Sequence, residues 1–124
     1  MNVVDSSGWL EFFADGPNAE HFAPPIQKVD ELLVPSIAIY EVFKRVLIER
    51  GEDDALTAVA AMQQGRLIEL DAPLALHAAR PSFELKLPLA DSVILASGRA
   101  YGATVWTQDS DFEDLPGVKY FPKQ

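Results

Sequence analysis

Carboxylates are the side chains of this sequence whose spacing most clearly suggests chemistry. The stretch VWTQDSDFEDLPG at residues 105–117 ends an apolar run and then presents four acids: Asp109, Asp111, Glu113 and Asp114. The chain already has a formal net charge of −9, and crowded carboxylates repel one another unless a cation lies among them. Oxygen ligands without cysteine favour a hard cation such as Mg²⁺ or Mn²⁺. As isolated residues, Asp109 and Asp111 could equally be turn residues.

Three further acids could reach the same place. Asp5 ends a short apolar run, Asp91 lies near the start of an apolar helix pattern, and Glu41 lies inside another such pattern. Each also has an ordinary interpretation. Asp5 and Asp91 could cap helices. Glu41 could pair with Lys44 or Arg45, about one turn along the helix.

The elements that must position these acids alternate along the chain between apolar strands and helices. Strands are predicted at residues 2–5, 31–35, 66–71, 103–109 and 118–121, and helices at residues 6–15, 36–51, 52–65, 72–86 and 89–102. Residues 16–29 predict a short helix broken by Pro24 and Pro25, and Pro81 should kink or shorten the helix in which it lies. Ser6 or Ser7 is a possible cap of the first helix, as is Asp5.

This alternation predicts the class of the fold. Crossover units give a parallel sheet covered on both faces, so we expect one α/β domain over residues 1–124, a three-layer α/β/α arrangement with a mostly parallel sheet of about five strands. Sites in such sheets lie at the carboxyl ends of the strands. The strands or the helices next to them should therefore bring Asp5, Glu41, Asp91 and Asp109 to one edge of the sheet.

Composition limits the other possibilities. The 124 residues are 48% hydrophobic and include no cysteine, which excludes disulfides and thiolate metal sites and fits a cytoplasmic protein. The first residues do not resemble a signal peptide, and no stretch approaches membrane-spanning length. The acidic balance argues against loose, charge-driven binding of nucleic acid, although not against nucleic acid held through a metal. Candidates for phosphate contacts, otherwise solvated helix residues, are Lys44, Arg45, Arg50, Lys86 and Arg99.

Several stretches together resemble the PIN-domain ribonucleases. These are MNVVDSSGWLEFFADGPNA at the start, VPSIAIYEVFKRVL in the first half, and LKLPLADSVILASGRAYGATVWTQDSDFEDLPGVKYF near the end, which includes a T-x-D-x-D-F signature. The resemblance spans almost the whole chain and is nearest to the VapC toxins of VapBC toxin–antitoxin pairs. It implies a Mg²⁺- or Mn²⁺-dependent endoribonuclease that leaves 5′-phosphate and 3′-hydroxyl ends.

The resemblance also implies roles for particular residues. The family's catalytic and metal-binding acids correspond to Asp5, Glu41, Asp91 and Asp109. Asp111 matches the second acid of the signature and could add a metal ligand. Ser6 and Thr107 match hydroxyl positions that line such sites, although a helix cap and an ordinary strand threonine are their plain alternatives. One metal ion or two could be held.

The resemblance implies partners as well. Besides an RNA substrate, we expect a homodimer and a VapB-like antitoxin that binds a groove near the active site. Aromatic residues of the first two helical segments could line this groove or could belong to the core; they are Trp9, Phe12, Phe13 and Phe22.

Two alternatives to this function stay open. A receiver-like phosphoacceptor domain would also bind Mg²⁺ at the strand ends, and Asp71 ends a predicted strand where such a domain carries its phosphorylated aspartate. The chain could also be a PIN-like binding module without catalytic activity.

Overall fold

A five-stranded sheet, in which every neighbouring pair of strands is parallel, organises the chain. The structure is a computed structural model and describes residues 1–124. The strand order is β3-β2-β1-β4-β5. The strands are β1 (Asn2–Val4), β2 (Leu32–Pro35), β3 (Arg66–Ile68), β4 (Thr104–Thr107) and β5 (Val118–Tyr120). The predicted parallel α/β class is confirmed.

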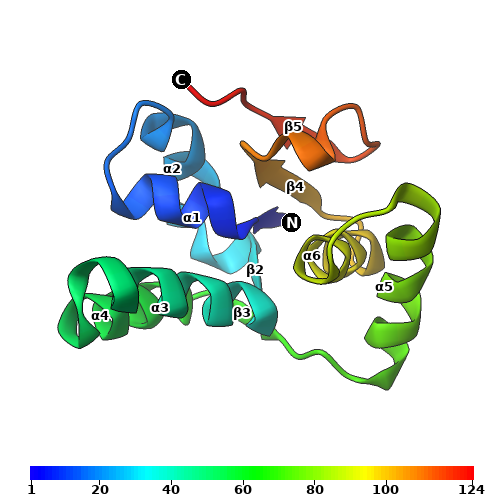
Figure 1. Cartoon of the computed structure of the whole chain (residues 1–124), viewed down its shortest axis with the longest axis horizontal. Helices are drawn as coiled ribbons and strands as arrows, with labels where there is room; N and C mark the ends of the chain where they lie inside the picture. The colour runs from blue at the N-terminus through cyan, green and yellow to red at the C-terminus, as the bar shows by residue number, and fades with distance from the viewer.

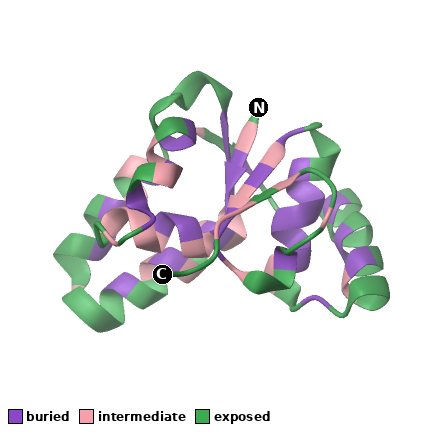
Figure 2. Cartoon of the chain, turned by 90° about the horizontal axis from the view of Figure 1, so that it is seen from above, coloured by how far each residue is buried: buried purple, intermediate pink, exposed green.

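Six α-helices cover the two faces of the sheet (Figures 1 and 2). On one side lie α1 (Ser6–Phe13), α2 (Ala19–Gln27), α3 (Ser36–Arg50) and α4 (Glu52–Met62), and on the other lie α5 (Ala72–Leu85) and α6 (Leu89–Ala100). Two short 3₁₀ helices, η1 (Val29–Glu31) and η2 (Ser110–Phe112), complete the three-layer arrangement. None of the helices combines the length and the apolar character needed to cross a membrane.

Helix α6 is the most deeply buried helix, because it lies between the sheet and α5. Its residues 92–98 are all buried. Gly98 permits this close packing, since a Cβ atom at this position would lie 2.7 Å from Cγ2 of Val105 in β4. The helix therefore has a fixed place against the sheet, and its first turn carries Asp91 to the carboxyl edge.

The central strands bring distant parts of the chain to that edge. Val4 of β1 pairs with Trp106 of β4, and the amide of Asp5 extends this pairing with a 3.0 Å hydrogen bond to the Trp106 carbonyl. Asp5 and the residues that follow β4 therefore leave the sheet side by side. Helix α3 begins directly after β2, so its first turns lie at the same edge.

The prolines were predicted to interrupt helices more than they do. Helix α2 continues through Pro24 and Pro25, and α5 continues through Pro81 to Leu85. Pro25 and Pro81 are buried, so their rings pack in the interior. That packing offsets the lost backbone hydrogen bonds, which a local propensity rule cannot take into account.

Candidate active site

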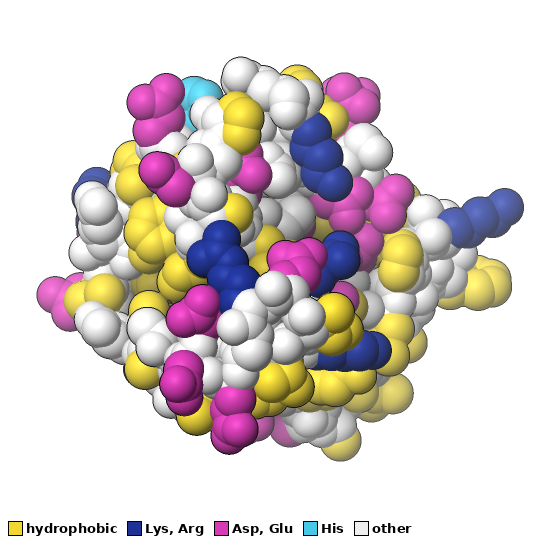
Figure 3. Space-filling view, turned by 60° about the vertical axis from the view of Figure 1, so that its left-hand side comes forward, with side chains coloured by type: hydrophobic (Ala, Val, Ile, Leu, Met, Phe, Trp, Pro, Cys, Tyr) yellow, Lys and Arg dark blue, Asp and Glu magenta, His cyan; other side chains and the backbone are white.

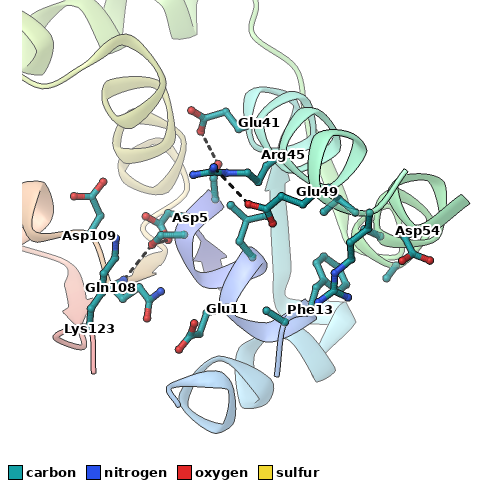
Figure 4. A pocket seen from close by; sticks show the side chains of 18 of the residues that line it. Asp5, Glu11, Phe13, Glu41, Arg45, Glu49, Asp54, Gln108, Asp109 and Lys123 are labelled. Carbon is teal, nitrogen blue, oxygen red and sulfur yellow. Dashed lines mark hydrogen bonds and ion pairs between the residues drawn. The ribbon is translucent and has the colours of Figure 1, made fainter. Parts of the chain in front are cut away.

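All four predicted acids line one cavity at the carboxyl edge of the sheet. The cavity has a volume of about 620 Å³, and its walls include Asp5, Glu41, Asp91 and Asp109. They come from the end of β1, from α3, from α6 and from the end of β4. Figure 4 shows Asp5 between Asp109 on one side and the α3 residues on the other.

Asp5 is held by three donors and is only 2% exposed. It accepts hydrogen bonds from the Thr107 hydroxyl at 2.6 Å, the Ser7 hydroxyl at 2.7 Å and the Gly8 amide at 2.9 Å. The last bond makes Asp5 the cap of α1, and of the three candidates Ser6 and Ser7 do not have this role. Asp5 thus caps a helix and also faces the cavity, and its two interpretations are compatible.

Burial dominates the protonation of Asp5. Desolvation raises its pKa from 3.8 to about 6, although the hydrogen bonds from Thr107, Ser7 and Gly8 act to lower it. The negative charge of Asp109 adds a smaller upward contribution. A carboxylate in this position is costly unless positive charge is close by.

Asp91, Asp109 and Asp111 form the tightest group of acids. One carboxylate oxygen from each lies within 4.8 Å of the others, and Asp109 also accepts a 2.9 Å hydrogen bond from the Asp111 amide. The pKa of Asp91 is raised to about 7. Partial burial is the largest cause, and the negative charges of Asp109, Asp5 and Asp111 raise the pKa further. A cation among these oxygens would relieve the repulsion, so the donor set fits a hard metal ion such as Mg²⁺ or Mn²⁺.

Glu41 lies outside this group of three acids and has a partner of its own. Its Oε1 accepts a 2.6 Å hydrogen bond from the Ser6 hydroxyl. The alternative role of Glu41, an ion pair with Lys44 or Arg45, does not occur, and Arg45 Nη1 instead lies 3.5 Å from Glu49 Oε1. Glu41 therefore keeps its carboxylate toward the cavity.

Thr107 connects two of the acids. Its buried hydroxyl donates to Asp5 Oδ2 at 2.6 Å and accepts from the Asp109 amide at 2.9 Å. An ordinary strand threonine would make neither contact. The hydroxyl therefore sets the side chain of Asp5 and the backbone of Asp109 relative to each other.

Three residues at the site escaped the sequence analysis. Asn18 is fully buried and donates from Nδ2 to Gln108 Oε1 at 3.1 Å and to the Pro122 carbonyl at 2.9 Å. Gln108 and Lys123 line the cavity. A signal existed for Gln108, which lies inside the T-x-D-x-D-F signature. None existed for Asn18, whose contacts span about a hundred residues, or for Lys123, which only the fold brings to the cavity.

Only some of the basic and aromatic residues considered for binding line the cavity. Of the five basic candidates, Arg45 and Arg50 line the cavity, whereas Lys44, Lys86 and Arg99 do not. Trp9 and Phe22 are fully buried core residues. Phe12 and Phe13 are partly buried, and Phe13 also lines the cavity. The aromatic cluster is thus mainly core and supplies one ring to the site.

Asp71 has the role of a helix cap and not of a phosphoacceptor. It accepts a 2.9 Å hydrogen bond from the Leu74 amide at the start of α5, and it does not line the cavity. The strand before it, β3, lies at the edge of the sheet, and the order 3-2-1-4-5 differs from the 2-1-3-4-5 order of flavodoxin-like sheets. The receiver-like alternative is therefore wrong.

The fold and the cavity define an α/β/α domain with a carboxylate site at the ends of its parallel strands. The sequence model of the PIN domain matches residues 3–118, and the chain belongs to the PIN domain family. No curated protein has a matching sequence.

Solved structures share the fold over nearly the whole chain. A toxin–antitoxin complex from Klebsiella pneumoniae is similar with a TM-score of 0.81 and 19% identity, covering 98% of this chain and 99% of that one. VapC20 from Mycobacterium tuberculosis, a toxin that cleaves the sarcin–ricin loop, has a TM-score of 0.79 and 17% identity, and the match covers 94% of this chain and 95% of VapC20. DNA-bound VapBC from Salmonella typhimurium has a TM-score of 0.72 and 17% identity, and the match covers 98% of this chain and 96% of the chain in that structure.

Proposed function

We propose that this chain is the toxin of a type II toxin–antitoxin pair and a Mg²⁺- or Mn²⁺-dependent endoribonuclease. The observation that carries the proposal is the convergence of four acids, from four separate elements, on one cavity of a PIN domain. These acids are Asp5, Glu41, Asp91 and Asp109. Toxins such as VapC20 share this fold.

Asp91, Asp109 and Asp111 would hold the metal ion, since their oxygens lie within 4.8 Å of one another. When bound, such an ion polarises a phosphate and lowers the pKa of a bound water. Asp111 is exposed, so it can adjust to an incoming ion more readily than the two half-buried acids.

The remaining acids would orient the reactants. Asp5 is held by its three donors in one position, so its charge is preorganised. Glu41 Oε1 is occupied by Ser6, while Oε2 has no hydrogen-bond partner in the protein and could accept one from the attacking water. Water attacks phosphorus in line, the bond to the 3′ oxygen breaks, and that oxygen takes up a proton. The products are a 5′-phosphate and a 3′-hydroxyl, and no 2′-hydroxyl nucleophile is needed.

An antitoxin partner belongs to the same proposal. Structures similar to this chain include a toxin–antitoxin complex and VapBC assemblies from Rickettsia felis and Salmonella typhimurium. We place a VapB-like segment of the antitoxin at the cavity, where it would exclude RNA from the acids. A homodimer is part of the proposal too, because exposed apolar side chains gather on α5 and α6, namely Leu76, Phe83, Leu85 and Leu89.

Expression in cells tests this function. Wild-type chain should arrest growth, and sequencing of RNA 5′ ends should find new ends that carry a 5′-phosphate. Asp91→Asn should abolish both effects, and co-expression of the antitoxin encoded beside the chain should suppress them. If the wild type produces no new RNA ends while Asp91→Asn behaves identically, the chain is a binding module and not a nuclease.

A further inference from the structure

Three basic side chains line the cavity, and two of them are not neutralised. Nη1 of Arg45 lies 3.5 Å from Oε1 of Glu49, and this pair is the only ion pair with an N–O distance within 4.0 Å in the molecule. Arg50 and Lys123 line the same cavity without such a partner. Other basic residues lie over aromatic rings outside the cavity, as Lys119 does over Trp106 at 4.4 Å. Arg50 and Lys123 are therefore cations available to a ligand in the cavity.

The two cations lie on different sides of the acids. Figure 4 shows Lys123 beside Gln108 and Asp109, with α3 on the far side of Asp5. Arg50 is the last residue of α3, nine residues beyond Glu41, which places it about 13 Å further along the helix axis. A ligand that reaches both cations therefore spans the cavity that the acids line.

The position of Lys123 is organised by its neighbours in the chain. The carbonyl of Pro122 accepts from Asn18 Nδ2 at 2.9 Å, and Gln124 Nε2 donates to Asn18 Oδ1 at 3.0 Å. The amide of Phe121 donates to the Thr107 carbonyl at 2.9 Å. Since Lys123 is flanked by these anchored residues, little backbone entropy would be lost when it binds a ligand.

The charge of the whole molecule makes these local cations important. A chain with a net charge of −9 repels a polyanion. In Figure 3 the basic side chains of the visible face are interspersed with acidic ones and do not gather into a broad patch. Attraction of a polyanion therefore depends on particular cations close to the site and not on a general positive field.

We infer that Lys123 and Arg50 bind backbone phosphates upstream and downstream of the scissile one, so that single-stranded RNA lies across the cavity. The inference rests on the proposed ribonuclease function and adds the two residues that position its substrate. A flexible single strand can follow a cavity whose acids are half buried, whereas a rigid duplex cannot. Phe13 lines the cavity and offers a ring on which an unpaired base can stack.

Binding of RNA to a catalytically disabled protein tests the inference. In an Asp91→Asn background, a short mixed-sequence single-stranded RNA with a fluorescent label is titrated at several salt concentrations. Lys123→Gln and Arg50→Gln should each weaken binding about tenfold and reduce the slope of log Kd against log salt by about 0.7, the value for one lost phosphate contact on a single strand. Lys28→Gln and Arg99→Gln are exposed matched controls outside the cavity and should change neither quantity.

The outcomes separate this inference from the proposed function. The inference is overturned if Lys123→Gln and Arg50→Gln bind RNA as their controls do. It is also overturned if duplex RNA binds as tightly as single-stranded RNA and loses the same affinity in the two variants. In the active protein, Lys123→Gln and Arg50→Gln should raise KM more than they lower kcat. Cleavage by the wild type with KM unchanged in both variants contradicts the inference alone. RNA binding that depends on Lys123 and Arg50, without any cleavage by the wild type, contradicts the proposed function alone.

Gln124→Ala tests whether the contacts with Asn18 position Lys123, without a substitution of the buried Asn18 itself. It removes one hydrogen bond to Asn18 and leaves both cations in place. If Lys123 acts from an organised position, Gln124→Ala should weaken RNA binding in the same direction as Lys123→Gln but by a smaller factor. Equal binding by Gln124→Ala and the parent protein would overturn the positioning role of the Asn18 contacts.

Discussion

The hydroxyl of Thr107 donates a 2.6 Å hydrogen bond to Oδ2 of Asp5, which joins the ends of two neighbouring strands. The two residues are 102 positions apart in the sequence. Because the same hydroxyl accepts from the Asp109 amide, one oxygen atom connects the most buried acid of the site with the segment that carries the group of three acids. Asp5 and the segment that begins at Asp109 are therefore one hydrogen-bonded unit, whereas Glu41 is held separately by Ser6.

Thr107→Val removes this connection at nearly constant shape. The change leaves Asp5 Oδ2 and the Asp109 amide without their partner, so the free energy of unfolding should fall by about 1–3 kcal/mol. RNA cleavage should fall about ten- to a hundredfold, because the acids lose their relative position. Thr104→Val on the same strand is the control, since the Thr104 side chain makes no such bond. Equal activity of the two variants would mean that Thr107 does not position the acids.

Glu41→Gln separates the charge of this side chain from its structural contact. Glutamine can still accept from the Ser6 hydroxyl through its Oε1 atom, so the melting temperature should stay close to that of the wild type. Cleavage should fall by about a hundredfold or more, because a negative charge at the site is lost. Glu69→Gln, an exposed position outside the cavity, should leave activity unchanged. Full cleavage by Glu41→Gln would remove Glu41 from the catalytic group.

The metal-free protein should become less stable as the pH rises from about 4 to about 7. The pKa values of Asp5 and Asp91 are raised from 3.8 to about 6 and about 7 in the folded state. Within this window the folded state binds more protons than the unfolded state, so the free energy of unfolding decreases with increasing pH. Melting curves in EDTA across the window check this sign. Stability that increases steadily with pH would show that the two acids are stabilised as carboxylates without metal.

Asp91→Asn should weaken the stabilisation of the protein by metal and raise its stability without metal. Above about pH 7 in EDTA the variant should melt at a higher temperature than the wild type, since one repelling charge is gone. Mg²⁺ at a hundredfold excess over its dissociation constant should stabilise the wild type by about 2.7 kcal/mol and the variant much less. Glu113→Gln, an exposed acid outside the metal group, should respond as the wild type does. Equal stabilisation of all three proteins would place the metal elsewhere.

Phe83→Asp should dissociate the proposed homodimer. The Phe83 side chain is 85% exposed on α5, and it borders an apolar cavity of about 340 Å³ between α5 and α6. A charge at this position opposes burial of the patch against a second copy. Light scattering should give a dimer for the wild type and a monomer for Phe83→Asp. Ile48→Asp on α3 is the control with comparable exposure, and a monomeric wild type would contradict the proposal.

The meeting of the four acids at one candidate site could be predicted because topology determines it. Parallel strands end at one edge, so acids that follow strands or begin the adjoining helices meet there whatever their separation in sequence. Asp5, Asp91 and Asp109 follow this rule directly. Glu41 follows it through its place in the first turns of α3.

The parts that sequence could not supply depend on side-chain packing. Asn18 reaches Gln108 and Pro122 only because α2, the end of β4 and the last residues of the chain pack together. No local pattern encodes such a contact. The predicted helix interruptions at Pro25 and Pro81 were wrong for a related reason, since tertiary burial outweighs the unfavourable propensity of proline inside a helix.

Cleavage of labelled RNA by purified protein tests the central claim most directly. Wild-type chain is compared with Asp91→Asn in Mg²⁺ or Mn²⁺ and in excess EDTA, and the ends of the products are analysed chemically. The account predicts cleavage by the wild type with metal, no cleavage by either protein in EDTA, and products with 5′-phosphate and 3′-hydroxyl ends. Undiminished cleavage in EDTA, or cyclic phosphate ends that require the 2′-hydroxyl as nucleophile, would contradict it.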